Sequence, residues 1–388
     1  MTDSFDKIKG VFFQLKGLTA IGVADIAGNA VSSIFWLYMA AALGAENYGA
    51  VSYFLAIGGI TSTISLLGSQ TTLTVYTAKN VRIESTIYLI AIISGIISSI
   101  VLFFMFQSIG LIVYAFGAII FGLVNGELLG KRLYKNYSKY ILAQKIIMVI
   151  LAIGLYRTVG INGVVLGIGL SFFTYVFKIY HGFRETKINF GLIKTRIGFI
   201  VKNYVLDLSS ALASSLSKLL VAPILGFALL GNYQLGLQLL AILLILPSII
   251  YKYTLPNDAS GNSTKRIKYI TIMISAGITV LGVLLSPIII PAMFPKYNEA
   301  IQIIQILSFS IVPATISLLY DSQFLGSEKT NFVLMGAGIH LTVLIVGILT
   351  LSKYFSLNGV AMAYVIATTI HTIFYLIISR NNRALSIR

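Results

Sequence analysis

Twelve apolar stretches, each long enough to cross a lipid bilayer, follow one another along almost the whole chain. A bilayer core about 30 Å thick takes about 20 apolar residues of helix, and backbone facing lipid must satisfy its own hydrogen bonds. The pattern predicts an all-α integral membrane protein, since no soluble fold could cover a chain with a mean hydropathy of +0.92. To within about four residues, the predicted spans are roughly 17–43, 48–68, 86–107, 109–129, 140–157, 160–180, 203–230, 231–253, 268–292, 301–324, 330–351 and 357–379.

The basic residues give these spans an orientation. The chain has 28 Lys and Arg residues, of which only Arg157, Lys296 and Lys353 fall on one side of the predicted membrane. Lys145 and Lys218 lie within spans, and all the others fall on the opposite side. Because cytoplasmic loops carry an excess of Lys and Arg, we expect a multi-pass plasma membrane protein with both termini in the cytoplasm.

An aspartate within an apolar span occurs twice, each time in the same setting. Asp25 comes seven residues before Ser32-Ser33, and Asp207 comes seven residues before Ser214-Ser215. An ionised carboxylate near the bilayer centre costs about 2.5–3.5 kcal/mol, so it is rare without a reason. Two of them at matched positions indicate a duplicated bundle with a polar seam, which is more typical of a transporter than of an enzyme.

Further motifs recur in the same order in both halves and extend this repeat. The matched pairs are Leu43-Gly44 and Tyr48-Gly49 with Leu230-Gly231 and Tyr233, Leu129-Gly130 with Leu325-Gly326, and Ile161-Asn162-Gly163-Val164 with Leu357-Asn358-Gly359-Val360. The first and seventh spans enter from the same side, so the repeat is parallel, about an axis along the membrane normal. We therefore predict two lobes of six transmembrane helices, residues 1–180 and 203–388. A cytoplasmic amphipathic linker, residues 181–202, joins them.

The seventh span carries a polar face with a lysine near mid-depth. Asp207, Ser214 and Lys218 share this face, because eleven residues at 100° each return almost to the starting angle. No acid is expected at the level of Lys218. Its ammonium either bonds to backbone carbonyls or extends to the membrane surface, or it lies in a hydrated cavity and awaits an anionic substrate group. We favour the cavity.

The first span shows the same face, with Trp36 in the place of the lysine. Asp25 and Asp207 either hold a coupling ion, H⁺ or Na⁺, or tie helices together through Asn29 and the serines. Lys145 of the fifth span reaches the level of these acids, and we interpret it as their counter-ion in preference to a substrate ligand. The candidates for substrate binding are thus Lys218, Ser214, Asn29, Ser32, Trp36 and Lys145, and those for ion coupling are Asp25 and Asp207.

Other classes of function find no support in the sequence. The chain has no cysteine, and its three histidines lack metal-ligand spacing, so we expect no metal site and no cofactor. We interpret His340 and His371 as helix-packing residues. The net charge of +16 is spread between apolar segments, so it indicates contact with membrane lipid rather than with nucleic acid.

The order of four motifs resembles the polysaccharide (O-antigen-type, Wzx-like) flippases of the multidrug/oligosaccharidyl-lipid/polysaccharide exporter superfamily. They are Leu43-Gly44-Ala-Glu-Asn-Tyr48-Gly49, Leu230-Gly231-Asn-Tyr233, Phe294-Pro295-Lys-Tyr297-Asn-Glu-Ala300 and Leu357-Asn358-Gly359-Val360. The resemblance implies two six-helix lobes around a central cavity lined by the first and seventh helices. It implies a flippase, not an enzyme, that moves polyprenyl-phosphate-linked glycan to the outer leaflet beside other polysaccharide-assembly proteins.

Two alternatives remain at this point. In a cation-coupled multidrug exporter of the same superfamily, Asp25 and Asp207 would bind the coupling ion and the drug cation. A membrane glycosyltransferase is less favoured, because the predicted outer loops are very short and the chain has no Asp-x-Asp motif.

Overall fold

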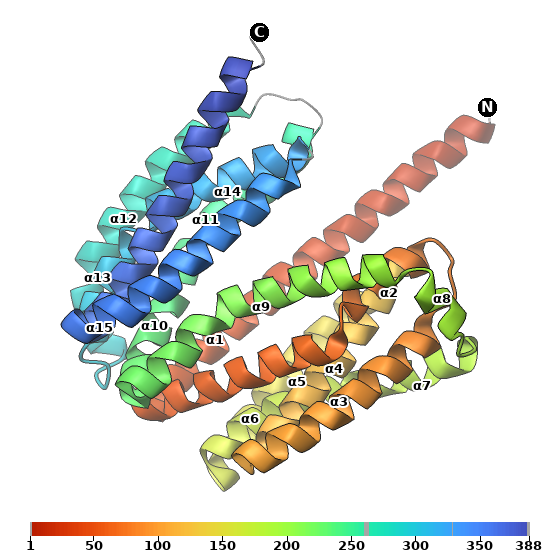
Figure 1. Ribbon diagram of the computed structural model, residues 1–388, viewed down its shortest axis with the longest axis horizontal. Helices are drawn as coiled ribbons and strands as arrows, with labels where there is room; N and C mark the ends of the chain where they lie inside the picture. Colours follow the sequence, from red (N-terminus) through yellow and green to blue (C-terminus); the bar gives the residue numbers. More distant parts are fainter. Residues whose placement is uncertain (1, 260–263, 328, 386–388) are drawn as a thin grey trace. The chain divides into compact units, whose positions relative to one another are not determined.

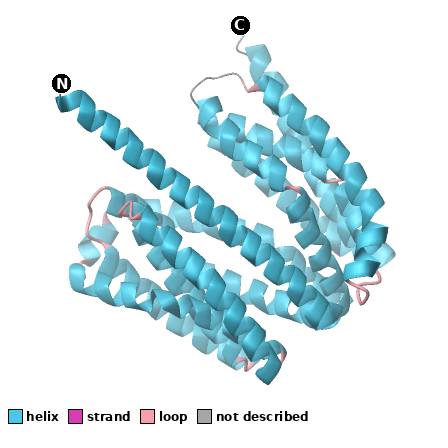
Figure 2. Cartoon of the chain, turned by 180° about the vertical axis from the view of Figure 1, so that it is seen from behind, coloured by secondary structure: helices cyan, strands magenta, loops and turns pink. Residues whose placement is uncertain are grey.

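The fold of the chain is entirely helical wherever it is described. The computed structural model describes residues 2–259, 264–327 and 329–385, with the side chains in these ranges except those of residues 2–26, 256, 259 and 381–385. Helices joined by short loops make up these ranges, and they contain no strand (Figure 2). This confirms the all-α fold class.

Two compact units divide the chain, and both are discontinuous in sequence. Unit 1 consists of Met1–Phe35 and Phe54–Ser215, and unit 2 consists of Trp36–Tyr53 and Leu216–Arg388. This partition differs from the expected lobes 1–180 and 203–388, because residues 36–53 join unit 2 and residues 203–215 join unit 1. The chain passes from one unit to the other inside helices, whereas the expected boundary lay in a loop. The two units are defined by contacts within the chain, and the two six-helix lobes stay a prediction.

Unit 1 contains the first helices of the chain and the beginning of a later one. Its elements are α1 (Thr2–Leu66, except residues 36–53), α2 (Ser69–Ala78), α3 (Glu84–Phe106), α4 (Ile109–Gly130), α5 (Tyr134–Val159), α6 (Ile161–Ser171), the 3₁₀-helix η1 (Phe172–Tyr175), α7 (Val176–Glu185), α8 (Phe190–Lys194) and the first part of α9 (Ile197–Leu225). A core cluster joins Leu73 of α2, Tyr88 of α3, Leu123 of α4 and Tyr175 of η1, all fully buried.

Unit 2 contains the middle of α1, the end of α9 and all the later helices of the chain. Besides residues 36–53 and the end of α9, it contains α10 (Phe227–Leu243), α11 (Ile245–Ala259), α12 (Lys265–Met293), α13 (Ala300–Ser308), α14 (Ile311–Gly326) and α15 (Thr330–Leu385) (Figure 1). Its core joins Val221 of α9, Tyr233 of α10, Ile303 of α13 and Val360 of α15. Each unit therefore has its own apolar core.

Two glycines with a positive φ interrupt the helices of the chain, Gly44 inside α1 and Gly226 between α9 and α10. Gly44 has φ 75° and ψ 172° inside α1, and Gly226 has φ 89° and ψ 168° between α9 and α10. Glycine adopts this conformation at little cost, whereas other residues rarely do. Gly226 follows Gly44 by 182 residues, as Asp207 follows Asp25.

The expected match of Leu43-Gly44 with Leu230-Gly231 is therefore wrong. The break after the seventh span comes at Gly226, and Gly231 follows Gly49 by the same 182 residues. These two glycines share a close approach within unit 2: a β-carbon on Gly49 would overlap the carbonyl oxygen of Phe227, and one on Gly231 would overlap that of Ala45. The sequence offered glycine at both 226 and 231, and hydropathy does not distinguish a turn from a packing contact.

A second pair of reversals lies 196 residues apart. Gly160, between α5 and α6, has φ 72° and ψ −145°, and Ser356, inside α15, has φ 49° and ψ −130°. Figure 1 shows that the two arms of α15 run in opposite directions from this point. Beyond each reversal a glycine lies against the preceding arm, Gly163 on the carbonyl of Leu155 and Gly359 on the carbonyl of Leu351.

The helices have the length and composition of membrane spans. Among the described residues, eight helices qualify, or ten when the bent pairs α10–α11 (48°) and α13–α14 (46°) each count as one. Their apolar side chains are largely uncovered: α3 exposes Ile97 by 59% and Phe104 by 77%, and α12 exposes Leu284 by 61%. Apolar surface on this scale belongs in lipid. The chain is a multi-pass membrane protein.

Helical residues occupy much of the expected linker 181–202. Residues up to Glu185 complete α7, α8 covers Phe190–Lys194, and α9 already begins at Ile197. The amphipathic segment expected over 190–202 is therefore divided between two helices. Phe190 and Ile197 are exposed by 57% and 59%, whereas Ile193 packs against the core of unit 1.

Candidate functional site

The polar face predicted for the seventh span lies on α9. Lys218 is half-buried, and among the described side chains no carboxylate lies within 4.0 Å of its ammonium nitrogen. One turn further along α9, Val221 and Ala222 belong to the core of unit 2. Helical spacing therefore places the aliphatic stem of Lys218 at the edge of that core and leaves its charge without an acidic partner.

The other members of this face are also without strong partners. Ser214 is exposed, and its hydroxyl donates to the carbonyl oxygen of Ala211 at 3.0 Å, which leaves acceptor capacity on Oγ. Asp207 is half-buried and accepts no hydrogen bond from any side chain that the structure describes. The two interpretations of Asp207, a coupling-ion ligand or a tie between helices, both stay predictions.

Of the corresponding residues of α1, the structure describes the side chains of Asn29, Ser32 and Trp36. Asn29 is exposed, Ser32 is half-buried with an unbonded hydroxyl, and Trp36 packs edge-on against Tyr48 with ring centroids 6.1 Å apart. Asp25 lies on α1, but its side chain is outside the described residues. Asn29 and Ser32 belong to unit 1, and Trp36, like Lys218, belongs to unit 2.

Lys145 of α5 meets α1 within unit 1. Its Cγ would lie 3.7 Å from a β-carbon on Gly28, so its stem passes close to the α1 backbone. Gly28 is nearly one turn beyond Asp25, which brings Lys145 to the level at which a counter-ion was predicted. No ion pair joins Lys145 to a carboxylate among the described side chains, so the counter-ion role stays a prediction.

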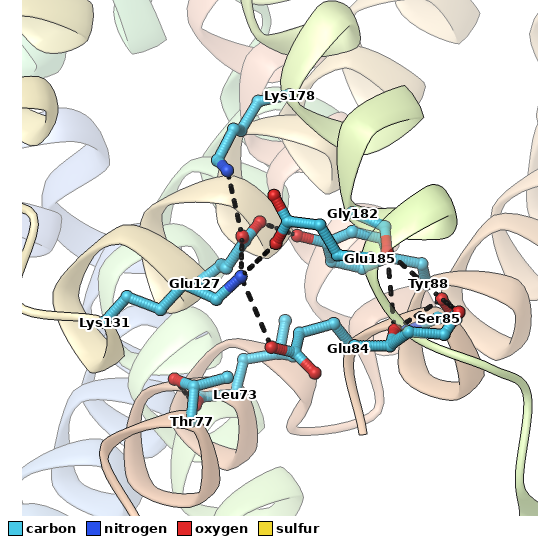
Figure 3. A network of polar contacts seen from close by, with 11 residues as sticks. Leu73, Thr77, Glu84, Ser85, Tyr88, Glu127, Lys131, Lys178, Gly182 and Glu185 are labelled. Atoms are coloured by element: carbon cyan, nitrogen blue, oxygen red, sulfur yellow. Dashed lines mark hydrogen bonds and ion pairs between the residues drawn. The ribbon is translucent and has the colours of Figure 1, made fainter. Parts of the chain in front are cut away.

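The densest polar cluster of unit 1 is one that the sequence did not single out. Lys131 lies just beyond α4, and its ammonium is 2.7 Å from Glu127, 2.7 Å from Glu185 and 3.4 Å from Glu84 (Figure 3). Burial lowers the pKa of Lys131, but its hydrogen bonds to Glu127 and Glu185 outweigh this and hold the pKa above its usual value. We call these residues, with Lys178 and Tyr88, the Glu127 cluster.

Glu127, the centre of this cluster, is fully buried and fully partnered. It accepts a hydrogen bond from the hydroxyl of Tyr88. It also forms ion pairs with Lys178, at 3.2 Å, and with Lys131. The cluster ties α3, α4 and α7 together at one end of unit 1. The spacing of Glu127 and Lys131, four residues apart on a helix, was the only local signal for it. The remaining partners are too distant in sequence to be recognised.

Unit 2 has two polar clusters of its own. Asp258 of α11 accepts hydrogen bonds from Lys268, Thr264 and Ser322, each at 2.6 Å. Asp321 of α14 accepts one from the hydroxyl of Tyr375 at 2.6 Å. The rings of His371 and His340 lie next to Tyr375 and continue this contact.

His371 lies edge-on to Tyr375, with ring centroids 4.3 Å apart, and His340 lies 5.9 Å from His371. Both histidines make aromatic contacts between the two arms of α15.

Comparison with known proteins identifies the fold. No family model and no curated protein matches the chain. Among solved structures, an inward-facing MATE family multidrug transporter of the MOP superfamily matches with a TM-score of 0.70 and 14% identity, over 92% of this chain and 95% of the other. The lipid II flippase MurJ in an inward closed conformation matches with a TM-score of 0.73 and 13% identity, over 93% and 87%. A MOP superfamily transporter from Pyrococcus furiosus gives 0.63 and 13%, over 96% of both chains. The chain has the fold of MOP superfamily transporters.

Proposed function

We propose that this chain is a flippase for polyprenyl-phosphate-linked oligosaccharide, which it moves from the cytoplasmic to the outer leaflet by alternating access. One observation carries the proposal: a half-buried lysine, Lys218, lies within a membrane-spanning helix with no acidic partner among the described side chains. A charge in a span is costly, and such residues usually mark the path of a substrate or an ion.

The chemistry of the cargo explains why this charge would be a cation. A lipid-linked sugar carries phosphate between its glycan and its lipid tail, and this anion must cross a hydrocarbon core about 30 Å thick. A lysine partway across the membrane supplies a point charge that compensates the phosphate, without the fixed bidentate hydrogen bonds that an arginine would form. Ser214, on the same face of α9, offers a hydroxyl to the phosphate or to sugar. Asn29, Ser32, Trp36 and Lys145 are further candidates for this path.

The fold is compatible with this activity. One of the solved structures that the chain resembles is described as a lipid II flippase, and lipid II is a lipid-linked substrate. The reversals at Gly44 and Ser356 would divide α1 and α15 into two spans each. With each bent pair counted as one span, this division would raise the ten candidate spans to twelve, which supports the prediction. The matched backbone angles at Gly160 and Ser356 support the parallel repeat.

The proposed topology has both termini in the cytoplasm. The chain lacks native cysteine, so single cysteines introduced at Ser260 and Lys353 report without background. A membrane-impermeant maleimide should label the variant at Lys353 in intact cells, and the variant at Ser260 only after permeabilisation. Labelling of both in intact cells would contradict the topology. Ser260 itself lies outside the described residues.

A cation-coupled multidrug exporter is the second candidate. The MATE neighbours favour it, and so does the carboxylate of Asp207, which has no partner among the described side chains, because an unneutralised acid in a span can hold a proton, Na⁺ or an organic cation. In either case we propose Asp25 and Asp207 as the coupling-ion pair.

Depletion of the protein in its native host separates the two candidates. A flippase predicts that lipid-linked glycan accumulates in the inner leaflet, where an enzyme or lectin added from outside cannot reach it. An exporter predicts unchanged glycan distribution together with slower efflux of a cationic dye such as ethidium. Unchanged glycan accessibility on depletion would contradict the flippase.

A further inference from the structure

Glu84 is the member of the Glu127 cluster whose charge is least compensated. It lies in the first turn of α3 and is only 4% exposed. Its Oε1 is 3.4 Å from the ammonium of Lys131, the longest contact that this ammonium makes, whereas its Oε2 is buried and has no hydrogen-bonding partner. Figure 3 shows that this second oxygen points away from Lys131.

The charges of the cluster do not balance. Three carboxylates, Glu84, Glu127 and Glu185, face two ammonium groups, those of Lys131 and Lys178. Glu127 is satisfied by both ammonium groups and by the Tyr88 hydroxyl, and Glu185 is half-exposed and therefore hydrated. The excess negative charge thus falls on Glu84. A buried carboxylate oxygen without a partner is costly, so a ligand that supplies a positive charge there would be stabilised.

A cavity of about 580 Å³ adjoins Glu84, which is large enough for an ion and several waters. Its walls include Thr77 at the end of α2, Asn80 in the turn before α3 and Thr186 after α7, together with Lys131 and Glu185 of the Glu127 cluster. Arg82 also lines the cavity, but it is exposed and makes no ion pair within 4.0 Å with any described carboxylate. It therefore makes no direct ion pair with Glu84.

We propose that the Glu84 carboxylate, at the wall of this cavity, binds a monovalent inorganic cation of the Na⁺ or K⁺ class. The hydroxyl oxygen of Thr77, the amide oxygen of Asn80 and water would complete the oxygen ligands that such an ion takes. A divalent ion is disfavoured because only one carboxylate oxygen is unshared, and the described residues contain no group of three acidic or histidine side chains placed for a metal. Binding would fasten the turn before α3 to α4 and α7.

Thermal unfolding of the purified full-length chain tests this site. The midpoint is measured at matched ionic strength in NaCl, in KCl and in N-methyl-D-glucamine chloride. Because a ligand that binds only the folded state raises its stability, we expect one of the metal ions to raise the midpoint saturably, by about 3 °C or more. Glu84→Gln should abolish the ion-specific shift, and Glu299→Gln, which removes an exposed carboxylate, should retain it.

Two further variants make the outcome decisive. The series is repeated in the Asp25→Asn/Asp207→Asn background, where a remaining ion-specific shift cannot come from the proposed coupling pair. If Glu84→Gln does not fold, Glu84→Asp, which keeps the charge on a shorter side chain, should raise the ion concentration that gives half of the shift. Equal midpoints in the three salts, or a shift that survives loss of the Glu84 carboxylate, would overturn the proposal.

Discussion

Gly231 lies so close to the carbonyl oxygen of Ala45 that a β-carbon on it would overlap that oxygen. The contact joins α10 to the part of α1 that belongs to unit 2, and the reciprocal contact of Gly49 with Phe227 lies beside it. Small residues allow membrane helices to approach in this way.

Gly231→Ala should lower the free energy of unfolding by about 1–3 kcal/mol, because the added methyl group must displace helix backbone. Gly277→Ala is the matched control, since a β-carbon on Gly277 meets nothing within 4 Å. In an open helix position alanine is favoured over glycine by about 0.5–1 kcal/mol, so the control should be neutral or stabilising. Thermal unfolding in detergent measures both. Equal effects of the two substitutions would show that the contact is not tight.

The reversals at Gly160 and Ser356 support a reciprocal prediction. Both have a positive φ, but only one is glycine. Ser356→Gly should stabilise the chain by about 1 kcal/mol because it relieves a strained backbone, and Gly160→Ser should destabilise it by a similar amount. The unfolding midpoints of the two variants should therefore move in opposite directions from that of the wild type. A decrease for Ser356→Gly would contradict the assignment of this reversal.

Hydropathy predicted the helices well, because the backbone of each span must form its hydrogen bonds within that span. The expected span 109–129 compares with α4 at Ile109–Gly130, and 268–292 with α12 at Lys265–Met293. The reversal that begins at Leu43-Gly44 was also foreseen. These features depend on neighbouring residues, which the sequence displays directly.

Features that depend on contacts between distant residues were missed or misassigned. Glu84, Lys131 and Glu185 meet although they are far apart in the chain, and only the pair Glu127–Lys131 had a local spacing. The turn at Gly226 was placed at Gly231 because both glycines follow an apolar run. The sharing of α1 and α9 between the two units was not predicted, since the chain passes from one unit to the other within continuous helix.

The polar cluster of Asp258 should make the stability of unit 2 sensitive to acid. Burial raises the pKa of Asp258, but its hydrogen bonds with Lys268, Ser322 and Thr264 outweigh this and hold the pKa below the usual 3.8. A lowered pKa contributes stability that is present above 3.8 and is lost as pH falls through the folded-state pKa. Asp258→Asn should therefore destabilise the chain at pH 7, by about 3 kcal/mol for a buried pair that loses one partner.

Unfolding midpoints of wild type and Asp258→Asn between pH 7 and pH 3 check this dependence. The difference between the two proteins should narrow as the pH falls below about 4. Glu299→Gln, at an exposed carboxylate, should follow the wild type throughout. A difference that stays constant down to pH 3 would show that the ionised carboxylate contributes nothing.

Asp25 and Asp207 should respond alike to substitution if they hold the coupling ion. Asn at either position keeps the shape but removes the charge, so transport should fall strongly while the amount of folded protein in the membrane stays near that of wild type. Transport per molecule, normalised to folded protein, is the measurement. Reduced protein with normal transport per molecule would instead assign the two acids to helix packing.

The most direct test of the proposed function is the rate at which Lys218 variants flip lipid-linked glycan. In proteoliposomes, Lys218→Ala should insert stably but flip the substrate at least about tenfold more slowly, as expected when about 1.4 kcal/mol of transition-state stabilisation is lost. Lys218→Arg, which keeps the charge, should retain part of the activity, and Lys353→Ala, at an exposed lysine, should behave as wild type. If Lys218→Ala flips lipid-linked glycan at the wild-type rate, Lys218 does not bind the phosphate and the proposed function is wrong.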